Sequence, residues 1–170
     1  MAVNIKFAKV KPDAIIPSKR DEDMGFDIYA CFDEDYIVIE PHETKLIPTG
    51  LASACDPGYG FLVFERGSTG SKGIARRCGV IDSGYRNEWF IGLTNTTNKT
   101  LFITKLSEEE TYNKHFGHVM TPSFCYPYSK GIAQTLVIPV PKTSVDEIAY
   151  DDLKKIESER GMGALGSSNK

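Results

Sequence analysis

The residues best suited to chemistry lie in residues 79–91, where an acid and an aromatic ring flank a turn. Asp82 precedes a Ser-Gly pair, and Tyr85 follows it. Glycine adopts positive φ without a Cβ clash, so this pair between two β-favouring runs predicts a tight hairpin. Apolar neighbours would leave Asp82 partly desolvated, and a positioned carboxylate of this kind can act as a general base on a water. The alternative is that Asp82 only caps the turn.

A second stretch, residues 65–72, combines the groups that bind phosphates. It holds Arg66 and Lys72 together with two glycines and three hydroxyl side chains. Glycine lets backbone N–H groups approach an anion, and arginine adds a bidentate charged fork. The spacing is not that of a Walker loop. A solvated polar loop is the alternative.

Two further features could complete such a site. Asp27 stands inside an apolar run, where a carboxylate is costly unless it is paired or hydrogen-bonded. It could neutralise Arg66, hold the water shell of a phosphate-bound metal, or do both. Arg160 leads into a tail of glycine, serine and small residues, which is either a floppy terminus or a lid that wraps phosphates.

Short β-type segments separated by Gly, Pro and Asp turns would position these residues. Strands at this spacing, without intervening helical patterns, predict an all-β sandwich or barrel. A capping-box spacing from Ser107 to Glu110 predicts one short helix, and residues 145–159 are either a helix or an extended arm. The expected strands are residues 4–10, 26–31, 36–39, 44–48, 59–65, 88–94, 100–104 and 133–140.

Composition narrows the class of protein. The chain has 170 residues and a net charge of −3, which predicts one domain over residues 1–170 and argues against a nucleic-acid polymer as partner. Four scattered cysteines without a Cys-x-x-Cys pair predict reduced thiols rather than a disulfide framework or a zinc site. No signal peptide and no 18-residue apolar run are present, so we expect no membrane association and a cytoplasmic location.

The order of these pieces resembles that of the trimeric dUTPase family. Its five motifs match residues 25–30, 66–72, 79–95, 131–136 and 160–168, and the third motif, Gly-Val-Ile-Asp-x-x-Tyr-Arg, is the most specific. The resemblance implies an all-β fold of the dUTPase type, a β-clip or distorted jelly-roll barrel with a mobile C-terminal arm. It also implies a hydrolase of nucleotide metabolism that converts dUTP to dUMP and pyrophosphate by water attack on the α-phosphorus. This activity supplies dUMP and limits uracil incorporation into DNA.

The resemblance further implies roles for single residues. Asp82 would activate the water, and Tyr85 would lie against the deoxyribose and exclude UTP. The phosphates would contact one subunit through Arg66, Gly67, Ser68 and Gln134, while the backbone of Gly79, Val80 and Ile81 would read uracil. Mg²⁺ would be held by the triphosphate, with Asp27 acting through its waters. In a homotrimer, another subunit would close the site with Arg160, Gly166, Ser167 and Ser168.

Three positions depart from the family pattern. Gly67 and Ser68 stand in the reverse of the usual Ser-Gly order, and Ser129-Lys130-Gly131 replaces the usual Asp-Arg before Ile132. Leu165 replaces the aromatic that stacks over uracil, so either the tail covers the base less well or another ring, such as Trp89 or Phe90, stands in.

Residues 105–128 resemble an insertion found in some phage-type members, with residues 160–170 as a flexible lid. We expect the insertion to be a decorative surface segment, with the binding of a regulatory protein as the alternative. A dCTP deaminase-like pyrimidine nucleotide enzyme is a further alternative, but the chain lacks an obvious catalytic Glu sequence of that relative.

Overall fold

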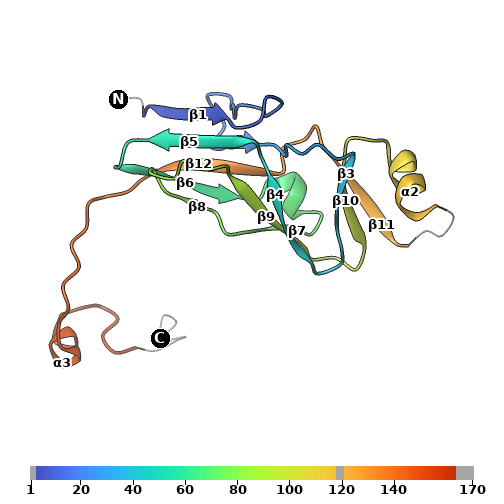
Figure 1. Cartoon of the computed structure of the whole chain (residues 1–170). Helices are drawn as coiled ribbons and strands as arrows, with labels where there is room; N and C mark the ends of the chain where they lie inside the picture. Colours follow the sequence, from blue (N-terminus) through green and yellow to red (C-terminus); the bar gives the residue numbers. More distant parts are fainter. Residues whose placement is uncertain (1–2, 118–120, 164–170) are drawn as a thin grey trace.

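The computed structural model describes residues 3–117 and 121–163, and strands make up most of its secondary structure (Figure 1). The strands are β1 (Ile5–Lys9), β2 (Phe26–Ile28), β3 (Tyr36–Ile39), β4 (Thr44–Pro48), β5 (Leu51–Cys55), β6 (Tyr59–Phe64), β7 (Ile74–Arg77), β8 (Val80–Ile81), β9 (Phe90–Asn95), β10 (Thr100–Thr104), β11 (Ser123–Pro127) and β12 (Ala133–Pro139). The helices are α1 (Gly67–Gly70), α2 (Glu108–Phe116) and α3 (Tyr150–Leu153). The all-β prediction is confirmed. Across the described ranges, no helix has the length and apolar character needed to span a membrane.

Within the described residues, hydrogen bonds join the strands into four small sheets. Their strand orders are β1-β5, β11-β10-β3, β2-β12-β6-β8 and β4-β9-β7. The pairs are antiparallel, except that β10 and β11 run parallel. The four cysteines are free thiols, one of them buried (Cys31) and one exposed (Cys78).

The four-stranded sheet separates two of the predicted site residues. Asp27 lies on β2, at one edge, and Asp82 directly follows β8, at the other edge. Neighbouring strands lie about 4.8 Å apart, so the three steps from β2 to β8 separate these edges by roughly 14 Å. The fold therefore holds the two carboxylates apart.

The core closes around Trp89, which is fully buried at 0 % exposure. The rings of Phe7 and Phe61 pack against it with centroid distances of 5.6 and 5.1 Å, and its Nε1 donates a hydrogen bond to Ser53 Oγ at 3.2 Å. Buried aromatic side chains of this size stabilise a core strongly. The expectation that Trp89 could cover uracil is therefore wrong, because no ligand reaches the ring, whereas Phe90 is 46 % exposed.

Residues 105–128 form α2 and then return to the body of the protein as β11. Ser107 caps the helix as predicted: its Oγ accepts a hydrogen bond from Glu110 N, and Glu110 Oε2 accepts one from Ser107 N. β11 then pairs with β10 and places Tyr126 in the main core at 1 % exposure. The expectation of a decorative surface segment is wrong for β11, because this strand belongs to a sheet.

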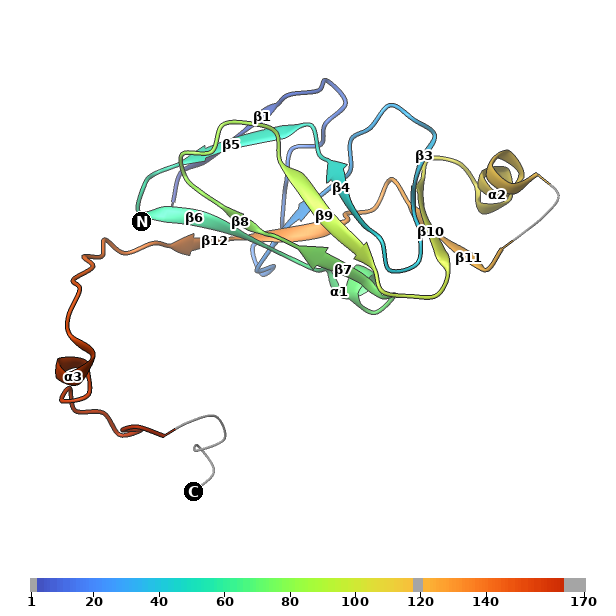
Figure 2. The ribbon, with the colours of Figure 1, turned by 60° about the horizontal axis from the view of Figure 1, so that its bottom comes forward.

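After β12 the chain leaves the body as an arm, residues 141–163. Figures 1 and 2 show that it departs at the end opposite α2 and carries only the short helix α3. Its apolar side chains are exposed, including Val145 at 94 % and Ile156 at 62 %. Of the two readings of residues 145–159, the extended arm is the better description.

Candidate functional site

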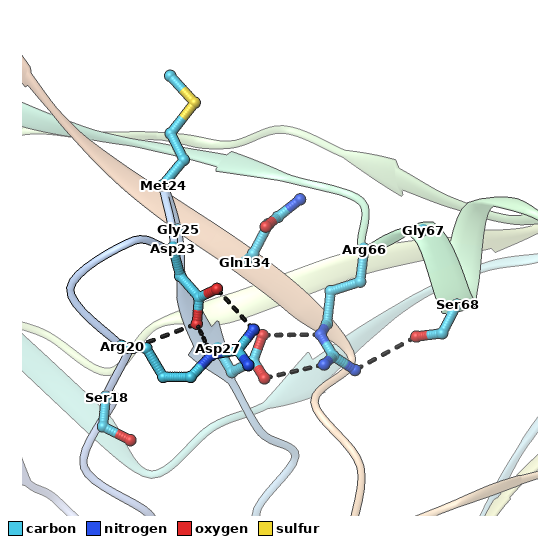
Figure 3. Close-up of a pocket in the computed structure, with 10 residues that line it drawn as sticks. All are labelled: Ser18, Arg20, Asp23, Met24, Gly25, Asp27, Arg66, Gly67, Ser68 and Gln134. Atoms are coloured by element: carbon cyan, nitrogen blue, oxygen red, sulfur yellow. Dashed lines mark hydrogen bonds and ion pairs between the residues drawn. The ribbon is translucent and has the colours of Figure 1, made fainter.

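A cleft of about 500 Å³ lies where β2, β12 and the start of α1 meet (Figure 3). It gathers the first, second and fourth of the predicted motifs at one place, although they are far apart in sequence. The cleft is lined by Ser18, Arg20, Asp23, Met24, Gly25, Asp27, Arg66, Gly67, Ser68 and Gln134. Five of the predicted site residues therefore share one cleft: Asp27, Arg66, Gly67, Ser68 and Gln134.

Arg66 and Asp27 form a two-pronged ion pair in this cleft. Arg66 Nε donates to Asp27 Oδ1 at 2.7 Å, and Nη2 donates to Oδ2 at 2.9 Å. Burial alone would lower the pKa of Arg66, but the charge and hydrogen bonds of Asp27 outweigh it and raise that pKa above its usual value. The ion pair offsets the free-energy cost of desolvation that was predicted for an acid inside an apolar strand.

Gln134 is fixed by a hydrogen bond to the backbone. Its Nε2 donates to the backbone oxygen of Glu65 at 2.8 Å, which ties β12 to the residue preceding Arg66. Gly25 lies close beside it: an added Cβ would lie 2.7 Å from Gln134 Oε1, so a side chain there would shift the amide. The stretch after Arg66 is a single helical turn, α1, rather than the open loop that the sequence suggested.

A second ion pair, Arg20 with Asp23, lines the same cleft. Arg20 Nε and Nη2 donate to the two carboxylate oxygens at 2.9 and 2.8 Å. The hydrogen bonds from Arg20 lower the pKa of Asp23 to about 2. Each arginine lining the cleft is thus matched by an aspartate, and the lining carries no net charge.

The turn that carries Asp82 forms as predicted, but the hairpin does not. Tyr85 N donates to Asp82 O at 3.1 Å, as in a β-turn. The flanking runs pair elsewhere, because β8 joins β6 whereas β9 lies between β4 and β7. Gly84 has no positive φ; the positive angles lie before the turn, at Cys78 (59°) and Gly79 (144°).

Asp82 itself is exposed, so the expected partial desolvation is not found in the single chain. The neighbouring residues are nevertheless fixed. Tyr85 Oη donates to Glu88 O at 3.1 Å and holds a ring that is 38 % exposed. Gly79 O accepts from Val63 N at 2.8 Å, and a Cβ on Gly79 would lie 2.9 Å from Val63 O. These contacts make a rigid, solvent-facing edge.

The structure thus divides the predicted site residues into three sets. One set lines the cleft. The second lies at or beside the Asp82 turn and does not line the cleft: Gly79, Val80, Ile81, Asp82, Tyr85 and Phe90. Of the third, Arg160 lies on the arm, where its Nε donates to Gly163 O at 3.2 Å, whereas Gly166, Ser167, Ser168 and Leu165 fall outside the described residues.

Sequence reasoning missed Arg20, Asp23 and Tyr126. Arg20 and Asp23 belong to a mixed charged run before β2, which is typical of a solvated loop. Tyr126 contacts Ser68 and Gly131 from β11, a strand that was not predicted. The one available signal was the cluster of aromatic residues, Phe124, Tyr126 and Tyr128, at every second position, as on one face of a strand.

Comparison with known proteins gives a consistent result. The dUTPase family model matches residues 11–107. The deoxyuridine 5'-triphosphate nucleotidohydrolase of Nautilia profundicola is 31% identical over 176 residues, which cover 99% of this chain and 100% of the relative. That of Paraburkholderia xenovorans is 30% identical over 150 residues, covering 86% and 82% of the two chains.

A solved structure shows the same fold. A mutant dUTPase of Staphylococcus bacteriophage 80alpha with dUpNHpp aligns with a TM-score of 0.75 at 21% identity, covering 98% of this chain and 99% of that one. The family model spans more than half of the sequence, and the first of the bacterial relatives above matches nearly all of it. On these grounds, the chain belongs to the dUTPase family.

Proposed function

We propose that this protein hydrolyses dUTP to dUMP and pyrophosphate by water attack on the α-phosphorus. The observation that carries the proposal is the cleft in which Arg66, Gly67, Ser68 and Gln134 converge, because these are the positions to which the family resemblance assigns the phosphates. The bacterial relatives are named for this activity. Such an enzyme acts in the cytoplasm, where it supplies dUMP and limits the incorporation of uracil into DNA.

In this assignment the phosphates lie at the cleft. Arg66 is held rigidly by Asp27, so its guanidinium is already oriented before a substrate arrives. Ser68 and the Gly67 N–H stand at the start of α1. Apart from the adjoining residues and the helix backbone, no atom of the described residues lies within 4 Å of a Cβ built on Gly67, so the backbone there is open to an anion. Preoriented donors of this kind stabilise developing charge without reorganisation.

The base and sugar lie at the Asp82 turn. Backbone groups of Gly79, Val80 and Ile81 read the uracil edge, and the Tyr85 ring excludes a 2′-hydroxyl. Phe90 is the exposed ring that remains to cover the base. The Asp82 carboxylate orients the attacking water and accepts its proton.

The neutral cleft fits a magnesium ion that arrives with the substrate. A triphosphate carries several negative charges, and both arginines of the cleft are already paired with aspartates. Within residues 3–117 and 121–163, no group of three His, Cys, Asp or Glu side chains could hold a metal ion. Mg²⁺ is commonly bound through substrate phosphates and retained waters, and it neutralises charge on the reacting phosphates. Asp27 would hold the metal through its waters.

The separation of Asp27 and Asp82 supports a site shared between copies of the chain. A water activated by Asp82 must lie within hydrogen-bond reach of it, whereas Asp27, which holds the Arg66 guanidinium, lies three strand spacings away across the sheet, roughly 14 Å. A homotrimer would join the cleft of one copy to the turn of another. The exposed arm would carry Arg160 and the tail residues Gly166, Ser167 and Ser168 to a neighbouring copy.

A second role, the binding of a regulatory protein by residues 105–128, is favoured by the position of α2. The helix lies at the far end of the body, and Glu108, Glu109 and Glu110 are exposed (Figure 1). Phage dUTPases such as that of 80alpha control the transfer of virulence genes by a proto-oncogenic G protein-like mechanism. Pull-down with and without residues 107–117 would test this role.

The catalytic proposal is tested by measuring pyrophosphate release from each dNTP and from UTP. Release from dUTP alone is expected. Ammonia release from dCTP would instead indicate a deaminase, and the absence of turnover on every nucleotide would leave only the binding role.

A further inference from the structure

The Tyr126 hydroxyl lies beneath the lining of the cleft and contacts two residues next to it. Tyr126 Oη donates to Gly131 O at 2.7 Å and lies 3.2 Å from Ser68 Oγ. The side chain is 1 % exposed, so it does not line the cleft and cannot itself touch a substrate. Its partners, by contrast, belong to the loop before β12 and to α1.

These contacts close a ring of hydrogen bonds. Arg66 Nη1 donates to Ser68 Oγ and to Gly131 O, both at 3.2 Å. A tyrosine hydroxyl has one hydrogen, and Tyr126 donates it to Gly131 O. Ser68 Oγ must therefore donate its own hydrogen to Tyr126 Oη. The ring therefore runs from Arg66 Nη1 through Ser68 Oγ and Tyr126 Oη to Gly131 O. The second hydrogen bond of Arg66 Nη1, to Gly131 O, closes it.

Together with Asp27, the ring fixes four of the five N–H donors of Arg66. Nε and one hydrogen of Nη2 point to Asp27, and both hydrogens of Nη1 point into the ring, which leaves the second Nη2 hydrogen for a substrate phosphate. Linked hydrogen bonds polarise and strengthen one another in a partly buried setting. The guanidinium plane and the Ser68 hydroxyl thus have one arrangement relative to β12.

Gly131 makes this arrangement possible. A Cβ built on it would lie 3.2 Å from Arg66 Cδ and 3.3 Å from Nε, so a side chain would displace the guanidinium. The usual family pattern has Asp-Arg before the Ile of the fourth motif, whereas this chain has Lys130-Gly131. The Arg66 side chain lies in the space left by the missing side chain, and its Nη1 donates to the same carbonyl as the Tyr126 hydroxyl.

We propose that Tyr126 is a positioning residue for substrate phosphates, acting through Ser68 and the Gly131 carbonyl on Arg66. It ties residues 105–128 to the cleft and compensates for the altered fourth motif and the reversed Gly67-Ser68 order. The inference rests on the proposed binding of phosphates by Arg66 and by the backbone at Gly67 and Ser68, because the Ser68 hydroxyl hydrogen is donated to Tyr126.

The test compares Tyr126→Phe with Tyr112→Phe. Tyr112 is the matched control because its hydroxyl is also largely buried and donates to Glu108 Oε1, away from the cleft. Loss of one hydrogen bond and of the order it imposes predicts that Tyr126→Phe raises the KM for dUTP roughly 3- to 10-fold, with kcat within about twofold. Tyr112→Phe should leave both constants unchanged.

Competitive inhibitors separate positioning from a general loss of stability. Pyrophosphate, which carries phosphates only, should inhibit Tyr126→Phe more weakly by the same factor as the rise in KM. Deoxyuridine, which carries none, should inhibit it as it does the unmodified enzyme. Gly131→Ala should reproduce this pattern, because its Cβ displaces Arg66 while the tyrosine remains. In a Ser68→Ala background, Tyr126→Phe should have little further effect, because the ring is already broken.

Two outcomes separate a failure of phosphate binding at the cleft from a failure of the role of Tyr126. If Arg66→Lys leaves the KM and the pyrophosphate inhibition constant unchanged, the assignment of phosphates to the cleft fails. If Arg66→Lys weakens both but Tyr126→Phe behaves like Tyr112→Phe, the assignment stands and the role of Tyr126 is refuted.

Discussion

Asp27 and Asp82 belong to the two edges of one four-stranded sheet, on β2 and directly after β8. The strands between them, β12 and β6, are paired through six residue pairs from Gln134 with Phe64 to Pro139 with Tyr59, so the spacing is rigid. We therefore expect a reaction that needs both carboxylates to draw them from two copies of the chain.

Mixing two inactive variants tests this sharing. Asp82→Asn should lower kcat roughly 10²- to 10⁴-fold, the range for a positioned general base. Arg66→Gln should also be inactive. When the two are refolded together, random assembly restores an intact Asp82 beside an intact Arg66 in about a quarter of shared sites. Pyrophosphate release measures the recovery.

Two outcomes would contradict these assignments. A mixture as inactive as its components would place both residues in the site of one copy. A near-normal rate for Asp82→Asn alone would show that Asp82 is not the base.

Tyr85 should control discrimination between dUTP and UTP. Tyr85→Ala removes the ring and should raise the relative kcat/KM for UTP by at least about 10-fold, because a site that excludes a hydroxyl by contact loses that contact. Tyr85→Phe is the matched control: it keeps the ring and loses only the bond to Glu88 O. Equal selectivity of the alanine variant and the unmodified enzyme would rule out the ring as the sugar gate.

Removal of divalent metal should affect turnover without affecting the free protein. EDTA should abolish most activity, while the unfolding midpoint without nucleotide should shift by less than about 1 °C, because a metal bound only with substrate does not stabilise the free fold. With a non-hydrolysable dUTP analogue present, Mg²⁺ should raise the midpoint. A fall of several degrees on EDTA treatment of the free protein would instead reveal a resident metal site.

The Asp27–Arg66 pair should contribute more to stability than the Arg20–Asp23 pair. Side-chain exposure is 32 % for Asp27 and 27 % for Arg66, whereas Arg20 is 88 % exposed. Asp27→Asn should lower the free energy of unfolding by about 1–2 kcal/mol, the range for a partly screened charged hydrogen bond. Asp23→Asn should leave the denaturation midpoint nearly unchanged. Equal losses for the two variants would contradict this ranking.

Truncation should separate the tail from the fold. Deleting residues 161–170 should remove most turnover and leave the unfolding midpoint unchanged, because Gly161, Met162 and Gly163 are exposed and contribute little to the core. Deleting only residues 169–170 is the control and should be silent. Retained activity after the longer deletion would refute the lid.

Much of the strand pattern could be predicted, because alternation of apolar residues and clear turn residues bound most strands. The predicted ranges 36–39, 44–48 and 100–104 coincide with β3, β4 and β10. β5 and β7 were missed: Leu51–Cys55 is made mainly of small residues, and Ile74–Arg77 carries two arginines, so neither has a strong β signal. Tertiary pairing with β1 and β9 makes them strands.

The cleft could be predicted only through its motifs. The charge pairing of Asp27 with Arg66 followed from the cost of a strand-interior acid, but the direction in which the Asp82 turn faces did not. Local sequence suggested that its flanking runs pair with each other. Instead, β8 pairs with β6, and β9 pairs with β4 and β7. Sheet partners far away in sequence decided that outcome, and local propensity could not reveal them.

The parallel pairing of β10 with β11 has an evolutionary consequence. Parallel neighbours need a crossover connection, and here residues 105–122, including α2, supply it. Surface connections tolerate changes in length and sequence, because their closure entropy grows only slowly with length. Selection can therefore vary the exposed side of this crossover, provided that Thr111 and Tyr112 still pack against β10 and that β11 still returns Tyr126 to the same register. The protein can change what its outer end displays to other molecules while its chemistry is inherited intact.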